Sequence, residues 1–349
     1  MEEQFQNACG NGNLEEAKKL LQLSQQLLQN NLNINIIENN EDIFINISAN
    51  NEFAFRETCL NKHLHVAEWL LKVKPNINIS TNNEEAFRYA CEKGHLLVAK
   101  WLLEIKPNIN ISALDEYAFK YACYNEQLEV AKWLLEVKPN LKYSAIIDYG
   151  FRYACCNGHL KVAKWFLEIK PKINTYTTIE YAFRFACFDG HLEVAQWLLE
   201  IKPNINISSN MEFAFRFACG KGHLLVAQWL LKIKPTINIA VDDEWAFRSA
   251  CENGYLKVAQ WLIQVDPDIN VSACVDFAFR YACENGHLEV AKWLLEVKPN
   301  INISTYYDYA FIQSCKKEHL AVAQWLQTLM PLKYVLEVKN NILLNWKIL

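Results

Sequence analysis

The stretch that decides the fold is EEAFRYACEKGHLLVAKWLLEIKPNINIS, residues 84–112. Similar stretches recur every 32 residues along most of the chain. A tryptophan, a proline and a cysteine each keep this spacing, the tryptophans from Trp69 to Trp325. A fixed period of this size is the sequence signature of a repeat array. Together with a divergent copy around Cys9, the sequence predicts ten units.

Each unit contains two apolar stripes at helical spacing. In residues 84–112 the first stripe runs to about residue 91, and the second runs from about residue 95 to residue 105. Gly94 between them can take the left-handed conformation that ends a helix. Pro107 stops the second helix, because the residue before a proline disfavours the helical conformation. The alternating Asn-Ile-Asn-Ile that follows predicts an extended return segment, so each unit should be two short helices and an extended loop.

No linker interrupts the repeats, so we predict one continuous array rather than two domains. Residues 1–25 are expected to form an N-terminal capping repeat, residues 26–43 an Asn/Gln-rich insertion, and residues 44–331 nine 32-residue repeats. The apolar spacing of residues 332–349 suits an amphipathic helix, and we predict a C-terminal capping helix there. The expected fold is all-α, a solenoid of about ten stacked helix–turn–helix units with short extended loops between them.

Composition narrows the classes of protein to consider. The chain has 349 residues, a net charge of −4, 52% apolar residues and 21% charged residues. These values exclude a disordered tail and a strongly basic nucleic-acid-binding arm. The first residues lack the basic and apolar regions of a secretory signal, and no stretch approaches 18 uninterrupted apolar residues. We therefore expect a soluble cytoplasmic protein that does not bind a membrane.

Residues 90–104, ACEKGHLLVAKWLLE, resemble the ankyrin repeat, in which two small residues precede a Gly-His-Leu turn and a second helix rich in Val and Leu. The copy at 286–292, GHLEVAK, is closer still. The family's Thr-Pro-Leu-His opening is replaced by sequences such as YAFK at 117–120, and the period is one residue shorter than the family's 33. The resemblance implies a protein-binding solenoid. This variant is similar to ankyrin proteins of giant DNA viruses, which would place it in an infected host cell.

Cysteine and histidine each recur at one position of most repeats, and we call such a set of equivalent residues a column. These columns could suggest a disulfide, metal or catalytic site, but their regular spacing argues against all three. Equivalent cysteines in adjacent repeats should lie about 8–10 Å apart, whereas a disulfide needs Cα atoms within about 7 Å. In the histidine column Gln127 and Tyr255 replace histidine, which a metal or catalytic role would not tolerate. The aromatic column at Tyr89 and its equivalents is interpreted as packing between repeats. We expect no catalytic residue, metal, cofactor or small-molecule substrate.

A line of seven arginines, with Lys120 at an eighth position, is the feature that favours nucleic acid. Each member has an acidic residue four positions earlier, as Glu84 precedes Arg88, and such a pair stabilises a helix by about 0.2–0.5 kcal/mol. Since the net charge is also negative, nucleic acid is the least favoured class of partner. Salt-sensitive binding of DNA or RNA would support it.

In a repeat scaffold the shared residues build the array, so function is expected where the units differ. They differ in the triplet before the acidic residue and in the residue after the cysteine column. The ankyrin resemblance places both on the border of a concave partner-binding surface. The predicted partner-binding residues are Leu114, Asp115, Tyr124, Ile146, Ile147, Cys156, Ile179, Phe188 and Met211.

The predicted function is a monomeric, non-catalytic scaffold that binds another protein through this surface. One alternative is an adaptor that presents the bound protein to other machinery through the ends of the array. A second alternative is a nucleic-acid-binding solenoid.

Overall fold

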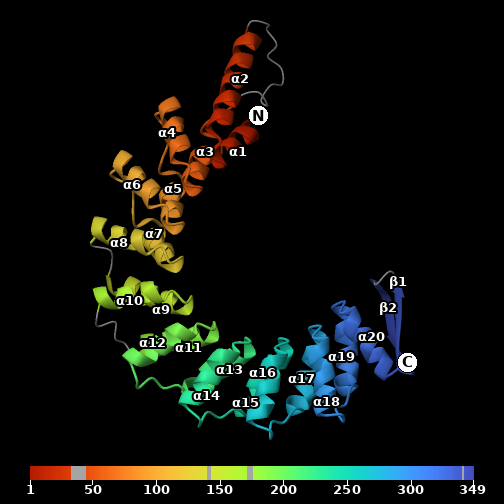
Figure 1. Cartoon of the computed structure of the whole chain (residues 1–349). Helices are drawn as coiled ribbons and strands as arrows, with labels where there is room; N and C mark the ends of the chain where they lie inside the picture. The colour runs from red at the N-terminus through yellow and green to blue at the C-terminus, as the bar shows by residue number, and fades with distance from the viewer. Residues whose placement is uncertain (33–44, 140–142, 171–175, 340–341) are drawn as a thin grey trace. The chain divides into compact units, whose positions relative to one another are not determined.

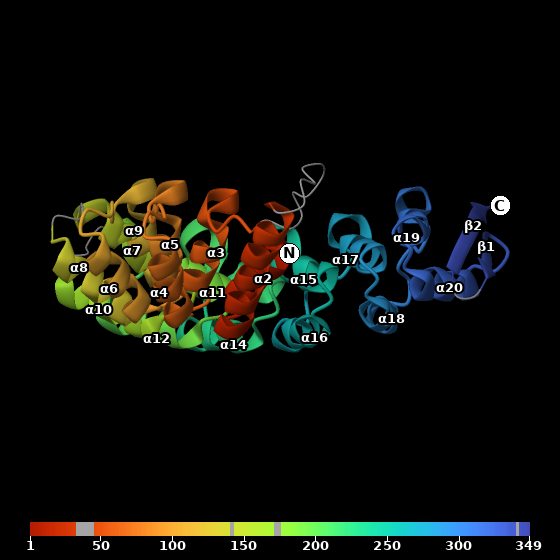
Figure 2. The same cartoon turned by 90° about the horizontal axis from the view of Figure 1, so that it is seen from above.

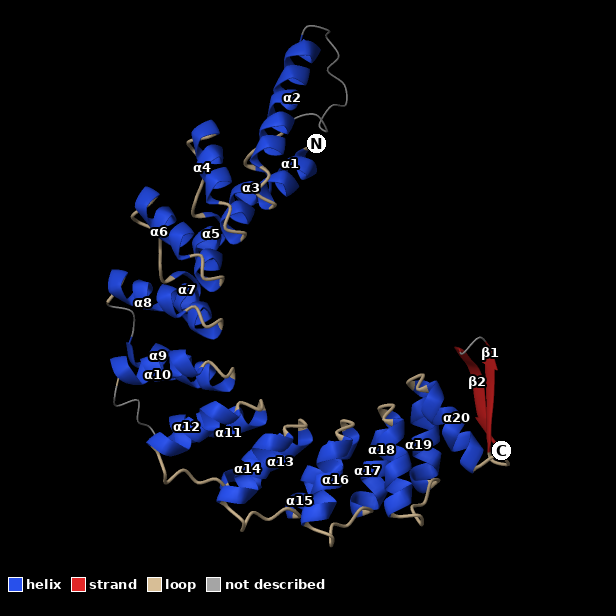
Figure 3. Cartoon of the chain, in the orientation of Figure 1, coloured by secondary structure: helices blue, strands red, loops and turns tan. Residues whose placement is uncertain are grey.

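The computed structural model describes residues 1–32, 45–139, 143–170, 176–339 and 342–349. Pairs of short helices recur along these residues, as the 32-residue period predicts (Figures 1 and 3). The first ten helices are α1 Glu2–Gly10, α2 Leu14–Leu32, α3 Ala49–Leu60, α4 Leu64–Val73, α5 Thr81–Glu92, α6 Leu96–Ile105, α7 Ala113–Tyr124, α8 Leu128–Val137, α9 Tyr143–Cys156 and α10 Leu160–Ile169.

The second ten helices continue the same pattern. They are α11 Tyr176–Phe188, α12 Leu192–Ile201, α13 Ser209–Gly220, α14 Leu224–Ile233, α15 Val241–Glu252, α16 Leu256–Val265, α17 Ala273–Glu284, α18 Leu288–Val297, α19 Thr305–Lys316 and α20 Leu320–Leu329. Two strands follow, β1 Tyr334–Lys339 and β2 Ile342–Ile348. None of the helices in the described ranges is both long and apolar enough to cross a membrane.

The chain divides into two compact units. The first unit comprises Met1–Ala154 and Lys161–Ile173, and the second comprises Cys155–Leu160 and Asn174–Leu349. The division runs through α9 and α10, the repeat whose core departs from the others. Gly150 stands there in place of an alanine, and Phe166 stands in place of a leucine.

Within each unit the first and second helices of the repeats form two layers. Figure 2 shows α5, α7 and α9 side by side above α6, α8 and α10, and it shows α15, α17 and α19 in the same relation to α16, α18 and α20. Direct packing joins successive first helices, such as α5 with α7 and α13 with α15. This packing stabilises helices that are too short to be stable alone.

One aromatic contact, repeated, builds the core of both units. Phe87 of α5 packs against Trp133 of α8 with ring centroids 6.2 Å apart, and Phe215 of α13 packs against Trp261 of α16 at the same separation. In each case a first-helix phenylalanine contacts the second-helix tryptophan of the next repeat. Cys91 and its equivalents are buried as well. The predicted packing of the Phe and Trp columns between neighbouring repeats is therefore confirmed within each unit.

The inter-repeat loops are short and contain tight turns. After Pro107 the amide of Ile109 donates to the carbonyl oxygen of Lys106 at 3.2 Å, which closes a turn and buries the Ile109 side chain. The first helix then opens with a left-handed turn: Asn82, Asn83 and Glu84 have φ of 53°, 58° and 61°. The same three positions have positive φ in seven repeats, in a chain region where the sequence places no glycine.

The N-terminal copy packs as a repeat, because the ring of Phe5 in α1 lies 6.3 Å from that of Trp69 in α4. Helix α2 continues to Leu32, so the start of the predicted insertion at residues 26–43 is helical. The rest of that insertion, residues 33–43, lies outside the described residues. The backbone amide of Ile45 donates a hydrogen bond to the Ser24 hydroxyl of α2 at 3.1 Å.

The C-terminal segment is an antiparallel hairpin, so the predicted capping helix is wrong. The hairpin nevertheless covers the last repeat. Phe311 of α19 contacts Trp346 of β2 with centroids 6.1 Å apart, in place of the tryptophan that a further repeat would supply. Tyr334 of β1 is fully buried, stacks on Phe311 at 4.0 Å, and donates from its hydroxyl to Asp308 at 2.6 Å. The fold is thus a helical solenoid with a small two-stranded sheet.

Candidate functional site

In several repeats a carboxylate at the start of the first helix bonds to the following loop, at Glu52, Glu84, Glu180 and Glu244. Glu84 accepts a hydrogen bond from the Ser80 hydroxyl at 2.5 Å through Oε2 and one from the Asn110 amide of the following loop at 3.3 Å through Oε1. Lys106 reaches the same Ser80 hydroxyl through Nζ. The acidic column is therefore part of the loop framework rather than the partner of the arginine four residues later.

The arginines instead clamp the left-handed turns. Arg88 donates from Nε to the carbonyl oxygen of Asn83 at 2.7 Å and from Nη2 to that of Asn82 at 3.0 Å. Arg56, Arg216, Arg248 and Arg280 make the same two bonds to the residues five and six positions earlier. The predicted pairing of each arginine with the acid four residues earlier is wrong for these repeats.

The guanidinium groups of Arg88, Arg216, Arg248 and Arg280 also lie over an aromatic ring of the next repeat, whereas that of Arg56 pairs with the Glu85 carboxylate at 2.5 Å. The Arg88 Cζ atom lies 4.6 Å from the ring centroid of Tyr117, and the equivalent distance from Arg216 to Trp245 is 5.2 Å. Arg280 lies 5.2 Å from Tyr309. A cation over an aromatic face is attractive by about 0.5–2 kcal/mol, more when desolvated. These arginines thus link neighbouring repeats. Their guanidinium groups are covered by aromatic rings along the first helices.

Side chains at the tips of the left-handed turns point to solvent. Leu114 is 53% exposed, Met211 58% and Tyr307 91%, and Val275 and Tyr306 are exposed as well. A left-handed conformation costs an ordinary residue roughly 1–2 kcal/mol, and asparagine and aspartate tolerate it better. Repeats with Asn at these tips avoid most of that cost. Apolar residues at the same tips are both strained and exposed.

The structure separates the residues predicted to bind a partner into three groups. Leu114, Asp115 and Met211 lie on exposed left-handed turns, as expected, and Tyr124 is exposed at the end of α7. Cys156 and Phe188 are half-buried, and the Phe188 ring lies 5.3 Å from Phe217. The Ile146 side chain lies outside the described residues.

Two of the predicted residues belong to the core. Ile147 is 2% exposed and Ile179 is 6% exposed, so the expectation that they contribute to an exposed surface is wrong. Helix α9 begins at Tyr143 and α11 at Tyr176, two residues and one residue earlier than the equivalent start of α5. Both isoleucines therefore lie inside a helix and face its buried side.

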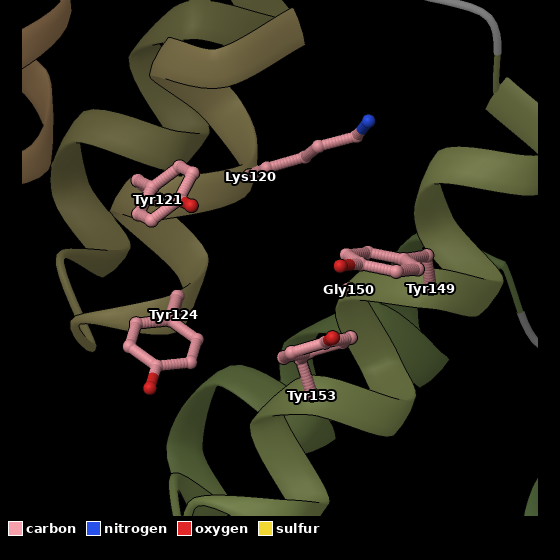
Figure 4. A pocket seen from close by; sticks show the side chains of 6 residues that line it. All are labelled: Lys120, Tyr121, Tyr124, Tyr149, Gly150 and Tyr153. Carbon is pink, nitrogen blue, oxygen red and sulfur yellow. The ribbon is translucent and has the colours of Figure 1, made fainter. Parts of the chain in front are cut away.

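A tyrosine-lined hollow of about 240 Å³ lies between α7 and α9 of the first unit. Figure 4 shows Tyr121 and Tyr124 on one wall, Tyr149 and Tyr153 on the other, and Lys120 extending toward Tyr149. Burial and a hydrogen bond with Tyr153 raise the pKa of Tyr149 to about 12, so this hydroxyl stays protonated at neutral pH. Sequence reasoning found Tyr124 but missed the hollow, although Lys120 in the arginine line and Gly150 in an alanine column mark its place.

The histidine and cysteine columns have structural surroundings. The Nε2 atom of His95 lies 2.9 Å from the carbonyl oxygen of Leu60 in the preceding repeat, and burial lowers the pKa of His95. Burial raises the pKa of the Cys59 thiol to about 12. Across the part of the chain that the structure describes, no three His, Cys, Asp or Glu side chains gather in a metal-binding group.

Comparison with known proteins finds one matching family. The family model for ankyrin repeats (3 copies) matches residues 55–147, 119–209, 151–243, 183–273 and 247–330. A solved structure, the crystal structure of human ASB11 ankyrin repeat domain, is 20% identical, covers 55% of this chain and 95% of its own, and has a TM-score of 0.40. Comparison with the curated proteins gives no match. The family match spans well over half of the chain, and the protein belongs to the ankyrin-repeat family.

Proposed function

We propose that this protein is a non-catalytic scaffold that binds another protein through the left-handed turns and the adjoining face of the first helices. Ankyrin repeats are generally protein-interaction modules. The observation that carries the proposal is the placement of Leu114, Met211, Val275 and Tyr307 at exposed turn tips with positive φ. Each such residue costs stability where asparagine would cost less, so a benefit outside folding must retain it.

The other repeated columns support a scaffold rather than a reaction centre. The carboxylates hold loops, the arginines clamp turns and stack on rings, and His95 and its equivalents bond to the preceding repeat. Because the guanidinium groups are engaged in this way, a phosphate backbone would have to compete with existing hydrogen bonds. Protein is therefore the class of partner that this surface favours.

Substitutions to asparagine test the proposal, because asparagine already occupies the equivalent tips at Asn82 and Asn83. A triple variant with Leu114→Asn, Met211→Asn and Tyr307→Asn should fold at least as stably as the wild type. Affinity capture from cell extract followed by quantitative mass spectrometry should then lose the specific partner. Leu97→Asn is the matched control, since it removes an equally exposed leucine from the second helix α6. An identical set of captured proteins for the triple variant and the wild type would refute the proposal.

An adaptor role is a second candidate, favoured by the exposed apolar side chains of the C-terminal hairpin. Leu332, Ile342 and Leu344 are all exposed beyond the buried Tyr334. Ile342→Asn with Leu344→Asn leaves the buried cap intact and tests whether a second protein binds there. Loss of one captured protein while the turn-dependent partner is retained would support the adaptor role. Retention of every captured protein would count against it.

A further inference from the structure

The hollow between α7 and α9 stands where the other repeats hold a guanidinium. Arg88 lies between the ring of Tyr89 on its own helix, at 5.6 Å, and the ring of Tyr117 on the next first helix, at 4.6 Å. Lys120, Tyr121 and Tyr149 are the residues at these three positions one repeat later.

The same arrangement recurs in the second unit. Arg216 lies 5.9 Å from Phe217 and 5.2 Å from Trp245. Arg280 lies 5.5 Å from Tyr281 and 5.2 Å from Tyr309, with Tyr306 at 4.6 Å. The place between two such rings is therefore built to hold a planar cation, and this chain shows that chemistry in both units.

At Lys120, three residues around this place differ from their equivalents in other repeats. Lysine replaces arginine, so the ammonium forms an ion pair with Asp115 at 2.5 Å and lies 5.5 Å from the Tyr149 ring. Tyr124 replaces the glutamate that at position 92 accepts a hydrogen bond from Tyr117. Gly150, whose backbone lines the hollow, stands where the other repeats have an alanine.

We propose that the tyrosine-lined hollow is an arginine-binding site that receives the guanidinium of one arginine side chain from the bound protein. This inference rests on the proposed function and names the part of the partner that the first unit would recognise. The hollow, at about 240 Å³, is smaller than the roughly 300–1,000 Å³ of typical small-molecule sites and suits a single side chain. The rings of Tyr121 and Tyr149 lie on its opposite walls, and each offers an aromatic surface to a guanidinium (Figure 4).

The local charges permit a second cation at this place. The Lys120 ammonium is already matched by the Asp115 carboxylate, and the Asp115 side chain is exposed at the rim of the turn. The tyrosine hydroxyls add hydrogen-bond acceptors for guanidinium N–H groups. A lysine side chain would bring the same charge but could not stack as a plane or donate along its edges. The site should therefore prefer arginine to lysine.

The experiment uses the full chain and three probes, the capped tripeptides Ac-Ala-Arg-Ala-NH2, Ac-Ala-Lys-Ala-NH2 and the citrulline analogue. Citrulline keeps the shape of arginine without its charge. Saturation-transfer NMR titrations should show binding of the arginine peptide about ten-fold tighter than either of the others. Lys120→Arg fills the hollow with the chain's own guanidinium, as in the neighbouring repeats, and should weaken binding of the arginine peptide at least ten-fold while the fold is retained.

Control variants separate the site from general charge attraction. Tyr153→Leu removes part of one wall of the hollow and should weaken binding of the arginine peptide. Tyr281 occupies the equivalent position four repeats later, beside Arg280, where the chain's own guanidinium already fills the space. Tyr281→Leu should therefore leave binding of the arginine peptide unchanged. Equal binding of arginine and citrulline peptides, or unchanged binding to Lys120→Arg, would overturn the inference. If the arginine peptide fails to bind while the turn-tip variants still lose the captured partner, this inference falls and the proposed function stands.

Discussion

The repeat that contains α9 and α10 carries a matched pair of substitutions whose coupling can be measured. Gly150 is the one glycine in a column of alanines, and Phe166 is the one phenylalanine in a column of leucines. A Cβ atom added at Gly150 would lie 2.5 Å from Cζ of Phe166 and 3.0 Å from Cε2. The Phe166 ring is fully buried against Phe119, with centroids 6.3 Å apart, so it has little room to move.

Gly150→Ala sets two effects against each other. Alanine improves helix propensity by about 1 kcal/mol over glycine, whereas forcing a methyl group into a packed ring costs about 1–3 kcal/mol. We expect a net destabilisation of roughly 1 kcal/mol. Phe166→Leu alone removes ring volume from a place that no methyl group fills, which should also destabilise. The double variant recreates the pair present in the other repeats and should be at least as stable as the wild type.

A double-mutant cycle in urea unfolding, followed by hydrogen exchange of α9 and α10, gives the coupling energy. We expect it to be about 2 kcal/mol, within the range for residues in contact. The inverse cycle, Ala118→Gly with Leu134→Phe one repeat earlier, is the matched control and should show coupling of the same sign. Stabilisation of the chain by Gly150→Ala alone, at about the helix-propensity value, would refute the reasoning, because it would mean that the ring does not occupy this space.

Three further outcomes follow from the burial of side chains. Under native conditions at pH 8, Cys274 should react with a thiol reagent within minutes, whereas Cys91 should react only after unfolding, because burial raises its pKa; labelling followed by peptide mass spectrometry distinguishes them. Burial lowers the pKa of His223 and His287 below 6.5, so the unfolded state takes up protons first and stability should fall as the pH drops below about 6.5. Replacing both histidines with glutamine should flatten that fall in urea titrations between pH 7 and pH 5.5. Tyr334→Phe should cost about 0.5–1.5 kcal/mol locally by removing one donor from the buried Asp308 carboxylate, which Lys333 still pairs at 2.7 Å, and hydrogen exchange should quicken in β1 and α19 but not in α13.

The helix pairs could be predicted from the sequence because each depends on residues close together in the chain. The spacing of Phe87, Cys91 and Trp101 fixes two buried faces, and Gly94 and Pro107 fix where the helices end. The conformation of the loops could not be read in the same way. Alternating Asn and Ile suggests a strand, but a strand needs a hydrogen-bonded neighbour, and the Glu84 carboxylate bonds the following loop as a turn instead.

The C-terminal hairpin escaped prediction because its apolar residues fit a helical pattern as well as an alternating one. What decides the outcome is the Phe311 ring, which the hairpin buries by packing Tyr334 and Trp346 against it. The candidate site was partly predictable, since variable positions marked the turn tips and Tyr124. The burial of Ile147 and Ile179 depends on where α9 and α11 begin, which no local pattern indicated.

The guanidinium clamp on the left-handed turns has a consequence for how this surface can change. Arg88 and its equivalents hold the turn through backbone carbonyl oxygens, which every amino acid possesses. The tip residues of these turns can therefore be exchanged without loss of the clamp, at the stability cost that the left-handed conformation imposes on residues other than asparagine and aspartate. Binding specificity can thus change while the loop is kept, and this makes the tips suitable positions for a randomised library from which new binding proteins are selected.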